Sequence, residues 1–288
     1  MKKWILISTM LIVALSCMAA TTIDPAKNDA YGANIGWVNA VGDTTHGAVI
    51  GQAFCSGYLY SANCGWISLG DGSPDDGQAY ANDSASDFGV NHDGQGNLSG
   101  YAYGANIGWV NFEQTHGQPN VNLETGELGG YAYGANVGWI SLDSGVYGVR
   151  TLTLDSGPDI DEDGIPDAWE YEHTNVLTVL AGGGTDSDGD GISDIDEYGS
   201  DTDPFDPDDY LCITDFEVDA STNRVTWTCV PTRRYTLQHG AALSNGMVWV
   251  DTGSSVVPPS GSEMTEEVSG IIDISRFYRV RVDLPLSP

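Results

Sequence analysis

The feature that most constrains this chain is a short motif that occurs four times between residues 28 and 150. The copies read AYGANIGWVN, YLYSANCGWISL, YAYGANIGWVNF and YAYGANVGWISL, and in each an Ala-Asn pair is separated by one residue from Gly-Trp. Trp37 and Trp109 are 72 residues apart, and Trp66 and Trp139 are 73 apart. The duplicated unit is therefore a pair of motifs, and each copy is expected to form the same small structural unit.

Each copy has the pattern of a β-hairpin. Tyr-Ala-Tyr alternates large and small residues, Gly-Ala-Asn supplies turn residues that tolerate positive φ, and Gly-Trp-Ile-Ser-Leu resumes a β-branched run. Helix signals are absent, and glycine is too frequent for helices. We therefore predict a mainly β protein with a repetitive antiparallel β-domain over residues 28–150. A sandwich, a barrel and a short solenoid are the alternative architectures.

The repeated aromatic residues allow two interpretations. We predict that the tryptophans form the core that joins successive hairpins, because a repeated core needs the same large residue in every copy. The alternative is a platform on which sugar rings stack. For that role the tyrosines are the better candidates, since one of each couple is expected to point away from the core. The tryptophans are Trp37, Trp66, Trp109 and Trp139, and the tyrosines are Tyr58, Tyr60, Tyr101, Tyr103, Tyr131 and Tyr133.

His46 and His116 both occur in Thr-His-Gly, at matching places in the first and third copies. We interpret them as turn residues that were duplicated with the motif rather than as metal ligands. The four-copy motif resembles the GYAW-type Gly-Trp-Ile repeats of exported proteins of environmental bacteria. This resemblance implies export and assigns no activity.

A second segment, residues 155–210, is rich in carboxylates and contains no Lys or Arg. Two runs, DIDEDGIPDAWE and DSDGDGISDIDE, place acids at loop positions 1, 3, 5, 9 and 12 and glycine at position 6. Acids at this spacing converge when a loop curls around an ion, position 7 offers its carbonyl, and the last Glu binds with both oxygens. A divalent cation removes their mutual repulsion, and calcium accepts more protein oxygens than magnesium does. The predicted ligands are Asp159, Asp161, Asp163, Ile165, Asp167 and Glu170, and then Asp186, Asp188, Asp190, Ile192, Asp194 and Glu197.

These loops resemble thrombospondin type 3 repeats and the related EF-hand-like loops of secreted bacterial proteins. The resemblance covers residues 159–209, including the run from Asp201 to Asp208, which is similar to the tail that closes such arrays and could lend ligands to the second ion. The stretch 177–185 between the loops departs from the tight eukaryotic repeats. The resemblance implies Ca²⁺ bound as a structural stiffener between two β-domains, with short helices after each loop. A solvated acidic linker is the alternative.

The carboxy-terminal segment, residues 211–288, alternates again and has loops rich in Gly, Ser and Pro. Its length and its five or six expected strands favour a small sandwich resembling immunoglobulin or fibronectin modules. This is the basic part of the chain, and we expect its arginines to pair with the acidic neighbour or to stay solvated. They are Arg233, Arg234, Arg276, Arg279 and Arg281.

Residues 1–20 have the pattern of a secretory signal peptide. Lys2 and Lys3 precede an apolar run that is too short to span a bilayer, and small residues follow it. Lipidation of Cys17 is the alternative. No later stretch of the sequence is long enough to cross a membrane. In an oxidising compartment the other cysteines predict two local disulfides, Cys55–Cys64 and Cys212–Cys229, with buried free thiols as the alternative.

The net charge of −31 makes nucleic acid an unsuitable partner and favours cations. No nucleophile elbow, zinc-protease motif or phosphate-binding loop is present, so we predict no enzyme activity. The sequence thus predicts a secreted or cell-surface calcium-binding protein of a bacterium that serves adhesion or matrix binding, with an extracellular glycan or a surface protein as partner. The alternative is a carbohydrate-binding module or a cryptic glycosidase in the repeat domain, with Glu113, Glu124 and Glu127 as arbitrary acid candidates.

Overall fold

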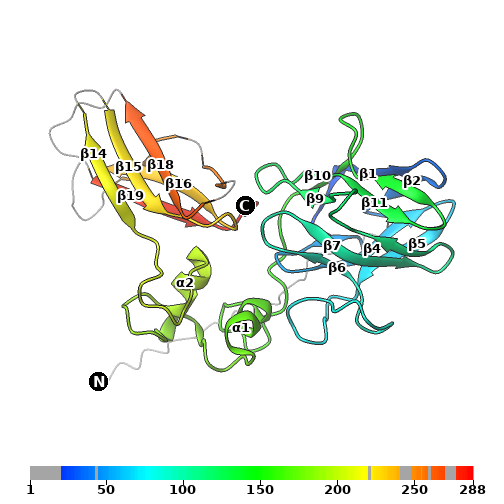
Figure 1. Cartoon of the computed structure of the whole chain (residues 1–288), viewed down its shortest axis with the longest axis horizontal. Helices are drawn as coiled ribbons and strands as arrows, with labels where there is room; N and C mark the ends of the chain where they lie inside the picture. Colours follow the sequence, from blue (N-terminus) through cyan, green and yellow to red (C-terminus); the bar gives the residue numbers. More distant parts are fainter. Residues whose placement is uncertain are drawn as a thin grey trace, which may run out of the picture.

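The computed structural model describes residues 21–42, 45–219, 222–240, 248–253, 255–258, 261–269 and 277–287. The predicted signal peptide, with Cys17, lies outside these residues, and so does Arg276. Figure 1 shows a β-barrel in blue to green, a loop-rich segment with two short helices, and a yellow-to-red β-sandwich. Within the described ranges no helix is long and apolar enough to cross a membrane. The chain is mainly β, as predicted.

The four motifs form an eight-stranded antiparallel barrel. Each motif is one hairpin, and neighbouring hairpins pair in chain order. The first strand also pairs with the last, Tyr31 opposite Ser141 and Gly32 opposite Ile140, so the sheet closes on itself. Of the three predicted architectures the barrel is therefore correct. Its strands are β1 (Ile23–Gly32), β2 (Gly36–Asn39), β4 (Cys55–Ser61), β5 (Gly65–Gly70), β7 (Leu98–Gly104), β8 (Gly108–Asn111), β11 (Tyr131–Gly134) and β12 (Gly138–Ser141).

Shorter strands extend the barrel at its edges. Three of them pair with barrel strands, and two pair only with each other. They are β3 (Val49–Ile50) on β4, β6 (Val90–His92) on β7, β13 (Val149–Thr151) on β1, and the couple β9 (Asn120–Val121) and β10 (Leu128–Gly129).

The turn asparagine of every motif joins one hairpin to the next. The side-chain amide of Asn63 donates to the backbone carbonyl of Ile35 in the preceding hairpin at 2.9 Å. The equivalent bonds of the other copies are Asn106 to Cys64, Asn136 to Ile107 and Asn34 to Val137, at 3.1, 3.0 and 3.0 Å. Because Asn34 of the first hairpin reaches the fourth, the four bonds form a ring around one end of the barrel. The ring explains why every copy contains the asparagine.

The glycine of each motif is required by the same ring of asparagine hydrogen bonds. Gly36, Gly65, Gly108 and Gly138 have φ between 73° and 80°, a left-handed conformation that costs other residues energy. A Cβ atom on any of them would lie 3.2–3.5 Å from the asparagine amide nitrogen of a neighbouring hairpin. Glycine thus provides both the turn conformation and the space for the ring.

The barrel interior is filled by small and β-branched side chains. The residue that follows each motif tryptophan points inward, and so does the residue between each pair of tyrosines. The interior is narrow at the turn end, where a Cβ atom on Gly32 would lie only 2.7 Å from the side chain of Ile35. The second copy has the bulkier Ser61 at this place and the smaller Cys64 in place of isoleucine or valine, so the volume is conserved.

The prediction that the motif tryptophans form the core is wrong. Trp37, Trp66, Trp109 and Trp139 face outward and are 55, 45, 45 and 44% exposed. Side chains alternate across a strand, so a tryptophan must face outward when the next residue is buried. An eight-stranded barrel has room inside only for side chains that fill a narrow space, and alanine, valine and isoleucine occupy it.

The prediction that the two tyrosines of a couple face opposite sides is also wrong. Tyr58 and Tyr60 are two residues apart and both are exposed, while Leu59 between them packs on the core. Tyr101 and Tyr103 flank the buried Ala102 in the same way. Residues i and i+2 of a strand share a face, so both tyrosines of each couple lie on the outer wall.

The two predicted disulfides are absent, since the four described cysteines are free thiols. Cys55 begins the 7-residue strand β4 and Cys64 lies in the turn beyond its other end. At about 3.3 Å per residue this separates them by ~20 Å, whereas a disulfide needs Cα atoms within about 7 Å. Cys212 faces Thr228 across two strands, so Cys229, the next residue, projects to the other side. The alternative of free thiols is the correct one.

The middle segment contains the short helices expected after each acidic loop. They are α1 (Asp167–Thr174) and α2 (Asp194–Ser200), with a 3₁₀ turn η1 (Gly182–Gly184) between them. A small apolar cluster of Ile165, Trp169, Leu180 and Tyr198 lies between the helices. The helices are too short to be stable alone, so this cluster and the loops must hold them.

The described residues of the carboxy-terminal part form two three-stranded antiparallel sheets. Val225, Trp227 and Val268 of one sheet and Tyr235 and Leu237 of the other form a shared core, as a sandwich requires. The first sheet contains β14 (Ile213–Val218), β15 (Thr222–Thr228) and β18 (Glu263–Ser269), and the second contains β17 (Val250–Asp251), β16 (Arg234–Gly240) and β19 (Phe277–Asp283).

Candidate metal centre

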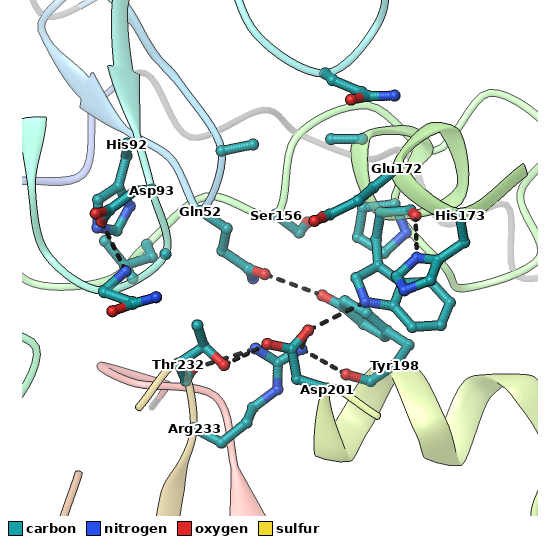
Figure 2. Close-up of a pocket in the computed structure, with 18 of the residues that line it drawn as sticks. Gln52, His92, Asp93, Ser156, Glu172, His173, Tyr198, Asp201, Thr232 and Arg233 are labelled. Atoms are coloured by element: carbon teal, nitrogen blue, oxygen red, sulfur yellow. Dashed lines mark hydrogen bonds and ion pairs between the residues drawn. The ribbon is translucent and has the colours of Figure 1, made fainter. Parts of the chain in front are cut away.

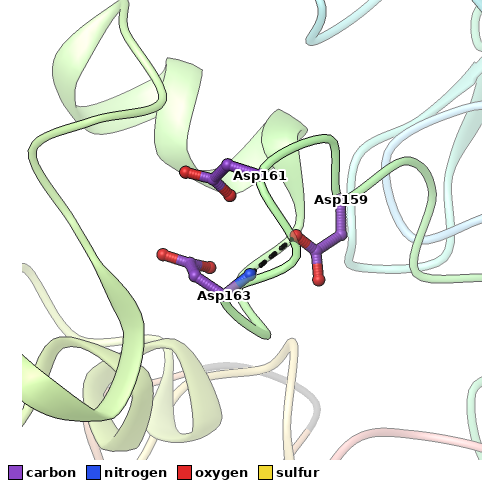
Figure 3. A group of neighbouring side chains, drawn as sticks. All are labelled: Asp159, Asp161 and Asp163. Carbon is purple, nitrogen blue, oxygen red and sulfur yellow. Dashed lines mark hydrogen bonds between the residues drawn. The ribbon is translucent and has the colours of Figure 1, made fainter. Parts of the chain in front are cut away.

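The two acidic runs fold into two similar loops, each of which gathers three aspartates. Asp159, Asp161 and Asp163 can each place a carboxylate oxygen within 4.8 Å of the others. Figure 3 shows these three carboxylates on one curl of chain before α1. The second loop gathers its own triad, Asp186, Asp188 and Asp190, in the same way before α2. The structure thus brings together the predicted ligands at loop positions 1, 3 and 5.

The first aspartate of each loop also shapes its backbone. The carboxylate of Asp159 accepts hydrogen bonds from the N–H groups of Asp163 and Gly164 at 3.2 and 3.1 Å. In the second loop Asp186 accepts from Gly189 and Gly191 at 2.8 and 3.1 Å. Gly164 and Gly191 have φ of 99° and 100°, so the sharp turn at position 6 needs glycine, as the spacing predicts.

The acids at loop position 9, Asp167 and Asp194, accept hydrogen bonds from the beginning of their own loop. Asp167 accepts a hydrogen bond from the backbone N–H of Ile160 at 2.8 Å. Asp194 accepts from the backbone N–H and from the hydroxyl of Ser187 at 2.9 and 3.0 Å. Both therefore tie the beginning of a helix to the beginning of its loop. Their place among the predicted ligands remains a prediction, as does the role of the Ile165 and Ile192 carbonyls.

The glutamate that ends each loop is the most informative residue. Glu170 and Glu197 are 0% exposed, and neither carboxylate has a hydrogen-bond partner on either oxygen among the described residues. The pKa of each is raised to about 8, mainly by burial and in smaller part by the charges of the aspartates in the same loop. One oxygen of Asp163 and one of Asp188 are likewise buried without a partner.

Such a set of oxygens fits a calcium ion. Buried carboxylates without partners are costly in a folded protein, and the expected remedy is a hydrogen-bond donor or a metal. Within the described residues no Lys or Arg forms an ion pair with any of these acids. A hard cation with many oxygen ligands would satisfy the orphaned atoms of both loops.

The predicted closing tail does not join either triad. Asp203 and Asp206 accept hydrogen bonds from Phe205 and Asp208 in local turns. Asp201 instead ends α2 in a left-handed conformation with φ of 58°. Its carboxylate accepts from the indole N–H of Trp169 at 3.1 Å, and therefore connects the second helix to the first.

Asp201 also lies where three parts of the chain meet. The Thr232 hydroxyl donates to its carboxylate, and the Arg233 guanidinium lies 3.3 Å from it. Arg233, which is 5% exposed, donates as well to the carbonyls of Tyr198 and Gly199 at 2.5 and 3.0 Å. A cation at these carbonyls stabilises the carboxyl end of a helix. The sandwich is thus bonded to α2.

The barrel contributes the remaining side of this junction. The hydroxyl of Tyr198 donates to the side-chain carbonyl of Gln52, a barrel residue, at 3.3 Å. Figure 2 shows Gln52, Tyr198, Asp201, Thr232 and Arg233 around one cavity, whose volume is about 550 Å³. Sequence analysis missed this junction. Its members are far apart in sequence and show no pattern, although the basic character of Arg233 had suggested an acidic neighbour.

The three acids named as glycosidase candidates, all in the barrel domain, form hydrogen bonds or an ion pair with other parts of the chain. Glu113 accepts hydrogen bonds from the backbone N–H groups of Thr115, His116 and Gly117 at 2.7–3.2 Å, which closes a turn. Glu127 pairs with Lys27 at 2.6 Å. Glu124 accepts a bond from the Val257 N–H at 3.3 Å. The structure thus places these three acids in different contacts.

Comparison of the chain with protein-family models, with curated proteins and with solved structures found no match in any of the three.

Proposed function

We propose that this is a secreted or cell-surface calcium-binding protein without catalytic activity, in which two calcium ions stiffen the segment between a barrel and a sandwich that serve adhesion or matrix binding. The observation that carries the proposal is the pair of buried glutamates, Glu170 and Glu197, whose oxygens have no partner among the described residues. The resemblance to thrombospondin type 3 and EF-hand-like loops supports the same ligand set. Calcium would be bound by the predicted acids of each loop.

The position of the helices supports a stiffening role. Each loop runs directly into a helix, so an ion that orders the loop also orients the helix that follows. The helices carry Trp169 and Tyr198, which contact Asp201 and Gln52. Arg233 then bonds α2 to the sandwich. Order in the loops would therefore be transmitted to both β-domains.

Calcium concentration outside cells suits this role. Extracellular modules of this kind bind calcium with dissociation constants of about 0.1–1 mM, so their sites are filled constantly and act structurally. Millimolar calcium is about one to ten times such a dissociation constant, so each site would stabilise the folded state by about 0.4–1.4 kcal/mol. Two sites would contribute about 1–3 kcal/mol, a noticeable share of a domain stability of about 5–15 kcal/mol.

The test is limited proteolysis of the exported chain in millimolar calcium and in EDTA. We expect EDTA to expose the segment 155–210 to cleavage, because its apolar cluster is small and its carboxylates would repel one another. The barrel should stay intact, since it has its own core. Magnesium at the same concentration is the control and should protect poorly. An unchanged cleavage pattern in EDTA would refute the stiffening role.

A further inference from the structure

The outer wall of the barrel has an unusual composition for so acidic a protein. Each hairpin presents two cross-strand pairs outward, for example Tyr103 opposite Trp109 and Tyr101 opposite Asn111. The outward positions of all four hairpins contain only Tyr, Trp, Asn and Ser, with Asp29 as the sole charged residue. We name the aromatic members the aromatic collar: Tyr31, Trp37, Tyr58, Tyr60, Trp66, Tyr101, Tyr103, Trp109, Tyr131, Tyr133 and Trp139.

The collar repeats one geometry four times. In every hairpin a tyrosine and a tryptophan face each other across the strands with ring centroids 4.8–5.1 Å apart and planes inclined by 55–66°. All eleven collar side chains are 37–55% exposed. The tilted contact holds each ring in place while one side stays open to solvent. The chain thus presents four similar Tyr–Trp pairs, two of which are braced by a further ring, Tyr147 on Trp37 and Phe88 on Trp109.

The hydroxyl and indole N–H groups of the collar are also free to form hydrogen bonds with a ligand. Among the described residues, no hydrogen bond involves a collar tyrosine hydroxyl or a collar indole N–H, unlike the hydroxyls of the buried Tyr80 and Tyr198. Hydroxyl and amide groups of Ser68, Asn111 and Ser141 lie beside the rings. Rigid aromatic rings combined with Ser and Asn are the means by which binding surfaces gain contact area and adaptable hydrogen bonds.

Charge decides which kind of ligand fits this surface. Asp29 is the one carboxylate on the wall, and it accepts a hydrogen bond from Asn39 at 2.7 Å. With a net charge of −31 the molecule repels anionic polymers, anionic lipid surfaces and a second copy of itself. A basic protein would be drawn to the acidic loops rather than to the uncharged wall. A neutral ligand with apolar ring faces and many hydroxyl groups meets every feature of the wall.

We propose that the aromatic collar binds neutral polysaccharide chains. Sugar rings stack on the Tyr–Trp pairs, and their hydroxyl groups bond to the collar hydroxyls, indole N–H groups and neighbouring amides. A repeating polymer can occupy several of the four similar pairs at once, which raises the apparent affinity. The inference names a ligand class for the adhesive role proposed above and rests on the barrel alone.

The test is affinity electrophoresis of the exported chain in calcium, in gels that contain soluble β-glucan, mannan, xylan or galactan, or the anionic polymer polygalacturonate. We expect at least one neutral polymer to retard the chain and polygalacturonate to leave it unretarded. Replacing one pair, Y103A/W109A, should weaken binding by about tenfold, and a second pair, Y133A/W139A, should abolish measurable retardation, because avidity is lost. W109F should retain part of the binding, since it keeps a stacking ring.

Matched controls distinguish a loss of binding by the collar from a loss of folding and from a loss of calcium binding. Tyr210→Ala removes a tyrosine of 40% exposure outside the barrel and should change nothing. Glu197→Gln, which acts on the calcium loop, should leave retardation unchanged, so failure of the calcium proposal can be told apart from failure of this one. The thermal transition of each variant shows whether it is folded. Retardation by no neutral polymer, equal retardation by polygalacturonate, folded collar variants that bind normally, or self-association through the collar would each overturn the proposal.

Discussion

Among single residues, Glu170 and Glu197 stand out because both are buried acids whose oxygens have no hydrogen-bond partner among the described residues. Each ends a loop at the place where a glutamate can offer two oxygens to one ion, and each is fully enclosed. Burial, together with the charges of the aspartates in the same loop, favours the neutral acid and raises the pKa of each to about 8. A residue that only packed in this position would be better replaced by an apolar one. The presence of two such acids supports the proposed binding of a metal ion.

The variant Glu197→Gln tests this directly. It removes a buried negative charge and one ligand oxygen, so calcium affinity at the second loop should fall at least about tenfold, a loss of ~1.4 kcal/mol. Without calcium the variant should be about as stable as the natural chain, because a pKa of about 8 keeps Glu197 mostly neutral at pH 7, and glutamine is neutral as well. Calorimetric titration and thermal unfolding measure the two quantities. Glu172→Gln, an exposed acid on α1, is the control and should affect neither.

A different buried acid predicts the response of the barrel to acid. Asp24 accepts hydrogen bonds from the Ala26 N–H at 2.8 Å and from the Arg150 guanidinium, and both lower the pKa of its carboxyl group. A lowered pKa stabilises the folded state above the ordinary value of about 3.9, and this stabilisation is lost as the pH falls through that value and below it.

Asp24→Asn should therefore cost about 1–2 kcal/mol at pH 7 and much less at pH 3. Urea unfolding at the two pH values measures the difference. The exposed Asp83→Asn serves as the control, because Asp83 forms no hydrogen bond with the described residues. Equal losses at both pH values would contradict the assignment of the bond to the charged form.

At the scale of elements, the hairpin and its asparagine form the unit from which the barrel is built. A single two-stranded hairpin is only marginally stable in water. Here each hairpin packs its inward residues on the other three and bonds to the next through the turn. Closure between β1 and β12 leaves none of the eight strands as an edge in the hairpin region, which protects the barrel from edge pairing with other chains.

The variant Asn106→Ala tests the ring of turn bonds. It removes the amide that donates to the Cys64 carbonyl and leaves that acceptor without this partner, so the barrel should lose about 1–2 kcal/mol. The unfolding transition of the barrel measures the loss. In the control Asn120→Ala the amide that is removed bonds only a carbonyl two residues away, so a smaller loss is expected. If the two losses were equal, the ring would have no special part in barrel stability.

For the whole molecule, the residues around Asp201 join the barrel, the middle segment and the sandwich to one another. Tyr198 bonds to the barrel, and Arg233 connects the sandwich to α2. Asp201 receives bonds from Trp169, Thr232 and Arg233. These polar contacts hold the two β-domains relative to each other together with the apolar cluster of Phe54, Tyr80 and Ala168 and the packing of Val257 on the barrel core.

Asp201→Ala should loosen this junction even when calcium is saturating. The variant removes the acceptor of three side chains, one of which is the buried Arg233, so the sandwich should separate more readily from α2. Small-angle scattering should show a larger radius of gyration, while calcium affinity stays within about twofold because neither triad is touched. Asp203→Ala is the control from the same tail. An unchanged radius would show that the junction does not depend on Asp201.

The local structure of this protein follows from residues that are close together in the chain. Alternation and turn residues predicted the hairpins, and the 1-3-5-9-12 spacing predicted two loops that the structure folds alike. These features are local, since strand pairing within a hairpin and the curl of a metal loop depend on residues close together in the chain. The same holds for the short helices, whose beginnings are fixed by the loops.

Three features depend instead on the complete fold: the side of each strand that faces inward, the closure of the sheet, and the contacts that join the parts. Trp109 was expected inside because it is large and apolar, but the narrow barrel accepts Val110 instead. Cys55 and Cys64 are close in sequence but lie at opposite ends of a strand. Gln52, Tyr198 and Arg233 meet although no pattern connects them. Closure, burial and distant contacts depend on the summed geometry of all strands, and no short stretch of sequence contains that information.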